Sequence, residues 1–451
     1  MAPSLVDSYG YKFRQTELHM SAEQLDPLKD KFDEVGSDAL TALDGMFPPP
    51  PPRAGWYAKG KQEDPQPDRD TYALLRDHPE KDARLLKLWD EVNAVLECIN
   101  WDQIKRGQDV FYRYAPAATL VRTGGHSAKV AKNRLFETFQ LLLQVTKSLE
   151  DIKPGGEGFA SAVRVRLLHA AVRSRIFKLN AQRPGYFDVD KYGVPINELD
   201  SMQSVCAFST NLVWLALPRQ GIYVRHQEAL DYLVLWRWVG YILGTPHWIL
   251  ETPECALASM ESLLKACLAP SKNSRALANN LVIALDGVLP IHEPKEFFEA
   301  GTRFINGDEM CDDVGLGKPG LYWDAVIRGI IWTLMVITYM SRSIPAWDRW
   351  QIKTFRALFW DYIVENKDTL KGGYKYEFKY VPHHDAKTGA ETADGPRLKN
   401  GIGHLEIFGL VGMCVSRSLL EPSSSLSQYI KCGSRQPGAG KIRDTLTDTE
   451  E

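Results

Sequence analysis

The feature that most constrains the fold is a helical repeat of apolar residues through most of the chain. Between about residues 71 and 420, apolar side chains recur at positions i, i+3, i+4 and i+7, and glycine or proline interrupts them. Helices are predicted over residues 85–99, 133–149, 159–179, 227–243, 256–268, 276–289, 322–340, 348–366 and 405–420. Residues 374–380, YKYEFKY, alternate with a period of two and predict a short β-hairpin. We therefore expect an all-α fold, a single large helical domain with at most one short β-hairpin.

The two ends of the chain differ from this helical body. Phe47 is followed by five prolines and then by the polar residues 60–70, a composition that supports neither a long helix nor a core of its own. The sequence thus predicts three regions: a Pro-rich lead segment packed on the body (1–70), an all-helical domain (71–420) and a polar C-terminal tail (421–451).

Charge and motifs exclude several classes of protein. The 451 residues hold 54 Lys and Arg against 57 Asp and Glu, so no basic footprint predicts binding to nucleic acid. The seven cysteines are widely spaced and include no C-x-x-C pair, which argues against a disulfide framework or a zinc knuckle. The P-loop, G-x-G-x-x-G, H-E-x-x-H and G-x-S-x-G motifs are absent as well.

The sequence also bears on membrane association. The N-terminus lacks a basic segment followed by an apolar stretch, as a secretory signal would have, so we expect an intracellular, cytoplasmic protein. The longest apolar run, residues 329–340, is too short to cross a bilayer. We expect it to be a buried core helix and expect no transmembrane segment, while peripheral membrane contact stays open.

One predicted helix combines apolar residues with an unusual set of cations. In residues 164–175, RVRLLHAAVRSR, His169 shares a face with Val165, Val172 and Arg173. An axial haem ligand needs such a place, with an imidazole in apolar surroundings and arginines near enough to neutralise the propionates. The alternative is a core histidine bonded to a backbone carbonyl, with the arginines on an exposed basic face.

The preceding predicted helix carries two polar residues on one apolar face. Arg134 and Thr138 lie four residues apart in NRLFETFQLLL and are therefore neighbours on the helix surface. Taken alone, they are equally explained by a surface arginine and by a threonine bonded to the carbonyl four residues earlier.

The order and spacing of these motifs resemble a known family. Arg134-x-x-x-Thr138 is followed by residues 166–173 (RLLHAAVR), by residues 193–197 (GVPIN) and by Trp236-Arg237-x-x-Gly240. Together they are similar to the family of latex clearing protein (rubber oxygenase) and mycophenolic-acid-type oxygenases, over about residues 75–420. The resemblance implies an all-α fold with a globin-like core that binds one haem b.

Roles for individual residues follow from the resemblance. It implies that His169 is the proximal iron ligand and that Arg134 and Thr138 are the polar pair of the haem site. Arg166 and Arg173, which flank His169, are the further cofactor-binding candidates.

One position departs from the family pattern. Glu137 stands where the rubber-cleaving members carry a lysine. A carboxylate is a poor iron ligand and a more natural proton acceptor, so Glu137 joins Arg134 and Thr138 as a catalytic candidate. An alternative is that Glu137 points to solvent and pairs with a lysine.

The functional hypotheses follow. The first is a haem-dependent oxygenase that cleaves or oxidises a C=C bond of an apolar prenyl- or terpenoid-type small molecule with O2, a substrate preferred over rubber itself. The second keeps haem but uses it as a peroxidase or monooxygenase of a secondary metabolite. The third is a non-catalytic helical lipid-binding or scaffold protein.

Overall fold

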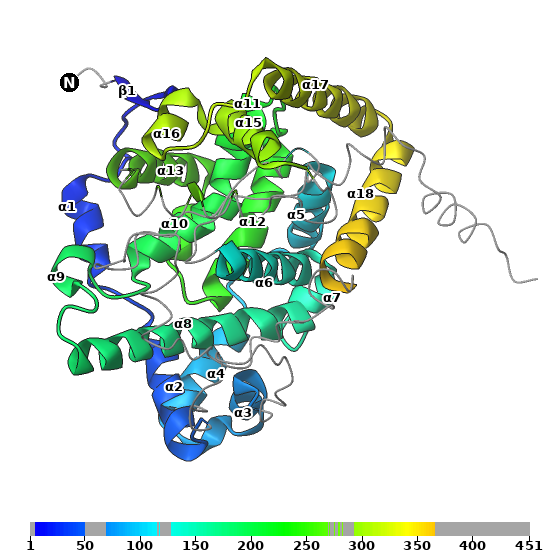
Figure 1. The fold of residues 1–451 in the computed structure, drawn as a ribbon. Helices are drawn as coiled ribbons and strands as arrows, with labels where there is room; N and C mark the ends of the chain where they lie inside the picture. Colours follow the sequence, from blue (N-terminus) through cyan, green and yellow to red (C-terminus); the bar gives the residue numbers. More distant parts are fainter. Residues whose placement is uncertain are drawn as a thin grey trace, which may run out of the picture.

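The computed structural model describes residues 5–49, 69–114, 128–268 and 293–365, with a few residues between these ranges. Helices dominate the described chain, and its one sheet has two antiparallel strands (Figure 1). The all-α prediction is confirmed. Residues 374–380, 405–420 and 421–451, for which the sequence predicts a hairpin, a helix and a tail, lie outside the described residues, as does most of 276–289.

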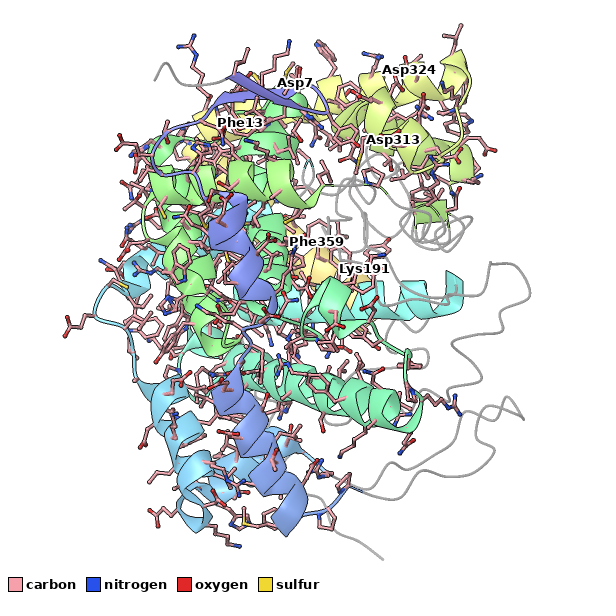
Figure 2. All side chains as sticks on the ribbon, turned by 90° about the vertical axis from the view of Figure 1, so that its left-hand side faces the viewer. Asp7, Phe13, Lys191, Asp313, Asp324 and Phe359 are labelled. Atoms are coloured by element: carbon pink, nitrogen blue, oxygen red, sulfur yellow. The ribbon has the colours of Figure 1, made fainter. Side chains whose placement is uncertain are left out.

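The N-terminal segment contains more structure than its composition predicts. Strands β1 (Leu5–Ser8) and β2 (Tyr11–Arg14) pair with Val6 opposite Phe13. The turn between them has positive φ at both Tyr9 and Gly10, as tight hairpins require. Figure 2 shows Phe13 at the same end of the molecule as Asp313, whose carboxylate accepts a 2.9 Å hydrogen bond from the Tyr9 hydroxyl.

The same segment continues into helices that help to build the core. Helix α1 (Ala22–Leu25) and a 3₁₀ turn (Asp26–Lys29) precede α2 (Glu34–Met46). Asp33 caps α2 by accepting a 3.0 Å hydrogen bond from the Gly36 amide. Leu40 and Leu43 of α2 are buried in the main hydrophobic core. Helix α3 (Thr71–Asp77), the 3₁₀ turn Pro79–Lys81 and α4 (Ala83–Asn93) follow, and both helices pack beside α2 at the end of the molecule opposite β1 (Figure 1).

Two helices pack closely through the centre of the body. These are α5 (Trp101–Tyr114) and α12 (His226–Ile242). Gly107 permits the contact, because a Cβ atom there would lie 2.4 Å from the backbone oxygen of Asp231. Trp238 of α12 is fully buried and donates a 2.9 Å hydrogen bond to the carbonyl of Ile152.

The remaining helices surround this pair. Between α5 and α12 the chain forms α6 (Ala128–Thr146), α7 (Leu149–Ile152), α8 (Glu157–Gln182), α9 (Val189–Tyr192), α10 (Glu198–Phe208), a π-helix (Leu212–Ala216) and α11 (Leu217–Arg219). After α12 come a 3₁₀ turn (His247–Leu250), α13 (Pro253–Cys267), α15 (Lys295–Asn306), α16 (Asp308–Asp313), α17 (Leu321–Ser343), α18 (Pro345–Phe359) and a π-helix (Trp360–Glu365).

The prediction of a buried core helix at residues 329–340 is wrong. Helix α17 begins eight residues before this stretch, ends three residues after it and lies at the edge of the molecule (Figure 1). Ile327, Ile331 and Leu334 are buried on one side of it, whereas Trp332 and Met340 on the other side are exposed. The sequence did not show which side is buried, because residues 329–340 are apolar on every side of the helix. Among the described residues, α17 is also the one helix long and apolar enough to cross a membrane, a test that soluble core helices pass too.

Candidate functional site

The predicted site residues lie on the antiparallel hairpin of α6 and α8. Two contacts define its register. A Cβ atom on Gly158, at the start of α8, would lie 2.5 Å from the backbone oxygen of Gln144, near the end of α6. Further along, Leu141 of α6 packs against Val165 of α8. Residue numbers thus fall along α6 as they rise along α8.

Continuing this register by one turn brings the predicted residues to one level of the hairpin. Glu137 and Thr138 lie one turn before Leu141, and His169 lies one turn after Val165. The side chains of Glu137, Thr138 and His169 are half-buried. The backbone of Arg134 lies one turn before Thr138 in α6, but its side chain is outside the described part of the chain.

A small apolar cluster borders this level of the hairpin. It consists of Val165 packed against Leu141, Leu168 and Leu243, and Leu141 and Leu243 also pack against the main core. By helical spacing, His169 lies between this cluster and the face of α8 that carries the buried arginines. The described residues contain no group of three or more His, Cys, Asp or Glu that could hold a metal ion by themselves. This setting fits a cofactor that needs one protein ligand and apolar walls.

Arg166 is engaged with the N-terminal part of the chain. Its side chain is 2% exposed and makes hydrogen bonds of 2.8 and 2.7 Å to the two carboxylate oxygens of Asp33, and a third of 2.7 Å to Glu91. Burial disfavours the charged guanidinium, but the two carboxylates outweigh that effect and raise the pKa of Arg166. The Nη1 group keeps no hydrogen-bond partner. Arg166 therefore joins α8 to α2 and α4.

The position of Arg166 leaves room only for a glycine at residue 244, just after the end of α12. Gly244 has φ +67°, and a Cβ atom there would lie 2.5 Å from Nε of Arg166. A side chain at residue 244 would therefore be strained by the backbone conformation and would also displace the guanidinium. The glycine that follows the end of α12 is therefore also a packing requirement of α8.

Arg173 lies seven residues after Arg166 on the same side of α8 and is also buried. Its hydrogen-bond acceptors among the described residues include no carboxylate. It donates hydrogen bonds to the carbonyls of Pro195 and Ile196, at 3.0 and 2.8 Å, and to the hydroxyl of Ser37, at 2.7 Å. Its guanidinium also lies over the ring of Phe32. Burial lowers its pKa to about 10, against the opposing charge of Asp33. Arg173 thus holds α8 to the turn before α10 and to α2.

These contacts bear on the arginines that flank His169. Their role in cofactor binding stays a prediction, and both arginines also hold α8 to other segments, which the sequence did not indicate. The partners of Arg166, Asp33 and Glu91, are 133 and 75 residues away from it in the chain, so no local pattern could identify them.

The GVPIN motif has a structural function as well. The side-chain oxygen of Asn197 caps α10 by accepting a 2.9 Å hydrogen bond from the Asp200 amide. Gly193 has φ +73°, and a Cβ atom there would lie 2.3 Å from the backbone oxygen of Lys29. The motif therefore binds the N-terminal segment to the body.

Comparisons with known proteins identify the region that contains this site. Residues 112–336, about half of the chain, match the family model described as "ER-bound oxygenase mpaB/B'/Rubber oxygenase, catalytic domain". A curated rubber oxygenase from Streptomyces sp. (strain K30) is 28% identical over 192 residues, which are 42% of this chain and 45% of that protein.

A solved structure of latex clearing protein LCP in the closed state covers 74% of this chain and 91% of its own, at 18% identity and a TM-score of 0.48. The chain spans less than half the length of the curated relative. Residues 112–336, with α6, α8 and the candidate site, belong to the catalytic-domain family of the ER-bound oxygenases mpaB/B′ and rubber oxygenase.

Proposed function

We propose that this protein is a haem b-dependent oxygenase that acts with O2 on a C=C bond of an apolar prenyl- or terpenoid-type small molecule. The observation that carries the proposal is the position of His169. It lies half-buried on helix α8, at the level of Glu137 and Thr138 on α6 and beside the apolar cluster around Val165. The match of residues 112–336 to an oxygenase family supports the class of reaction.

The donor set fits haem in kind. A haem supplies its own four nitrogen ligands, so the protein needs to add one imidazole. His169 provides this group from α8, whose position is fixed by the hydrogen bonds of Arg166 and Arg173. When bound, the haem would supply the iron chemistry that activates O2 toward the alkene.

The other residues of the site perform binding and proton chemistry. Leu141, Val165, Leu168 and Leu243 present hydrocarbon, which suits an apolar substrate and excludes water. In our proposal the Thr138 hydroxyl donates a hydrogen bond to a polar atom of the reactants, and the Glu137 carboxylate accepts a proton. Arg134, on the same face of α6 as Thr138, would provide a positive charge near the cofactor.

We assign Arg166 and Arg173 a positioning role in this site. Both guanidinium groups already bind protein acceptors around α8, and only the Nη1 group of Arg166 remains unpaired. They hold the helix that carries His169, and the haem propionates would find their charge compensation mainly elsewhere.

The experiment is a turnover assay with the full chain expressed in the presence of a haem precursor. Prenylated and terpenoid compounds and short polyisoprene oligomers are incubated with the protein under air and under argon, and the products are identified by mass spectrometry. We expect products with carbonyl or other oxygen-containing ends, labelled by ¹⁸O2. A haem-loaded protein that oxidises substrates only with added peroxide would establish the peroxidase alternative instead. Protein that binds no haem would refute both.

A further inference from the structure

Helix α17 carries an apolar stripe on the side that faces away from the body. The residues of this stripe recur every three or four positions and are all exposed: Leu321, Ala325, Gly329, Trp332, Val336 and Met340. Leu321 is 89% exposed and Trp332 is 63% exposed. Of the fifteen large hydrophobic side chains exposed among the described residues, seven lie between residues 321 and 350. Such a concentration marks an interaction surface rather than scattered surface residues.

Helix α18, which follows α17 directly and packs against it, presents positive charge on its own exposed face. Apart from Pro345 at its start, its exposed residues share one helical face: Ala346, Arg349, Trp350, Lys353 and Ala357. This face presents two cations and an indole that is 62% exposed, and it contains no acidic residue. We call the outer faces of α17 and α18 together the α17–α18 surface.

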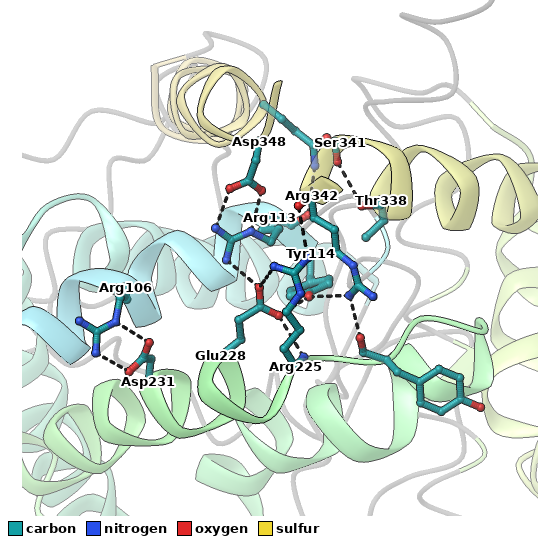
Figure 3. A network of polar contacts seen from close by, with 12 residues as sticks. Arg106, Arg113, Tyr114, Arg225, Glu228, Asp231, Thr338, Ser341, Arg342 and Asp348 are labelled. Atoms are coloured by element: carbon teal, nitrogen blue, oxygen red, sulfur yellow. Dashed lines mark hydrogen bonds and ion pairs between the residues drawn. The ribbon is translucent and has the colours of Figure 1, made fainter. Parts of the chain in front are cut away.

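The acidic residues of these two helices are already paired. Asp324 of α17 accepts a 2.8 Å hydrogen bond from Arg328. Asp348 of α18 turns inward and forms a two-point ion pair with Arg113 of α5, at 2.6 and 2.8 Å (Figure 3). The net charge that the α17–α18 surface offers to a partner is therefore positive.

A polar network holds the corner between the two helices in place. In Figure 3, Arg113 contacts both Asp348 of α18 and Glu228 of α12. Arg342, near the end of α17, donates a 3.0 Å hydrogen bond to the hydroxyl of Tyr114. Both helices are thus fixed to the central pair α5 and α12, and the surface is presented as a preformed unit.

We propose that the α17–α18 surface docks the protein on a membrane that contains anionic lipids. Hydrocarbon side chains, tryptophans and flanking cations are the residue types that bind at the interface of such membranes. A bilayer supplies both the apolar layer for Trp332 and Met340 and the negative charge for Arg349 and Lys353. In a dimer formed through this surface, the partner copy would present the same two helices, whose acidic residues are already paired. It would therefore offer no free negative charge to Arg349 and Lys353.

The helix would lie in the plane of the membrane interface. Ile327, Ile331 and Leu334 are buried on the inner side of α17, which packs on α15 and α18. Crossing the bilayer would strip these protein contacts away, whereas lying on it leaves them intact. This docking does not depend on the proposed oxygenase chemistry.

The test is a flotation assay of the full chain with vesicles of phosphatidylcholine and with vesicles that also contain phosphatidylserine. We expect binding to the anionic vesicles that weakens as salt is added. Trp332→Ser combined with Met340→Ser should lower the partition coefficient about tenfold or more. Arg349→Glu combined with Lys353→Glu should lower it about thirtyfold or more on anionic vesicles, because each cation near such a surface contributes about fivefold.

Matched controls lie away from this surface. Trp248→Ser removes another exposed tryptophan, and Lys87→Glu with Lys178→Glu reverses two exposed lysines of α4 and α8. We expect both controls to bind like the wild type, and circular dichroism checks that each variant is folded. Sodium carbonate at high pH should release the bound protein.

Several results would overturn the proposal. These are a wild type that binds neither vesicle, surface variants that bind as well as the wild type, or protein that resists carbonate and so spans the bilayer. Light scattering tests whether the surface instead binds a second copy of the chain. If the wild type is a dimer that Trp332→Ser and Met340→Ser convert into a monomer, the surface belongs to a second copy of the chain.

Discussion

Replacing Arg166 with methionine tests whether the helix that carries His169 is fixed by a buried ion cluster. Methionine keeps much of the side-chain volume but removes the charge and all three hydrogen bonds to Asp33 and Glu91. The two carboxylates would then remain at a buried junction without their cation. We expect Arg166→Met to be strongly destabilising.

The magnitude follows from the burial of the three groups. Removing one partner of a buried ion pair costs about 3–5 kcal/mol. The side chains of Asp33 and Glu91 are 12% and 31% exposed, so each can regain some hydration after the loss of Arg166. We therefore expect the lower end, a loss of about 3 kcal/mol in the free energy of unfolding.

The assay is denaturant unfolding followed by circular dichroism, with Arg84→Met as the matched control. Arg84 makes the same two-point contact with Asp82, at 2.9 and 2.7 Å, but on the surface. Because water screens this exposed pair, its loss should lower the free energy of unfolding far less than the loss of Arg166. If Arg166→Met costs no more than Arg84→Met, the buried cluster does not hold α8, and the positioning role is wrong.

Three further predictions concern the same region. Gly244→Ala should cost about 1–3 kcal/mol in unfolding experiments, because alanine is strained at φ +67°, while Gly45→Ala, with open space around it, should be tolerated. Burial lowers the pKa of His247, so its contribution to stability is complete above pH 6.5 and is lost as pH falls through the lower folded-state pKa; an unchanged acid dependence of unfolding in His247→Gln contradicts this. Glu137→Gln should slow turnover while haem stays bound, and imidazole should shift the ferric wild-type spectrum without prior reduction; a spectrum that imidazole does not move argues against an open iron site.

The helices that the sequence predicted best are those with one continuous apolar face and a clear end. Helix α12 ends at Ile242, just before Gly244 and Pro246, and α8 brackets the predicted range 159–179. Helix α5 was not among the predicted ranges, although Ile104, Val110 and Phe111 are buried along it. What the sequence could not show is the close approach to α12 at Gly107 and the hydrogen bond from Gln108 to the Val145 carbonyl, because both partners lie far along the chain. The hairpin of residues 5–14 was also not predicted, because strands of only four residues give too short an alternating pattern.

The candidate site could be predicted only as far as local spacing reaches. The helical repeat identified the faces of His169 and of Thr138, and the α6–α8 register brings these faces to one level. The partners of Arg166 could not be found, because they come from α4 and from the residue before α2. The exposure of α17 was also hidden, because helical periodicity does not tell which apolar face the rest of the chain will cover.

The most direct test of the proposed function is the absorption spectrum of the purified protein with and without His169. We predict that the wild type shows the Soret band of a histidine-ligated haem. His169→Ala should lose most of the bound haem, and added imidazole should restore the histidine-type spectrum. The matched variant His247→Ala, at another half-buried histidine, should keep the wild-type spectrum. A His169→Ala protein with wild-type haem content and an unchanged histidine-ligated spectrum would contradict the assignment of the iron ligand.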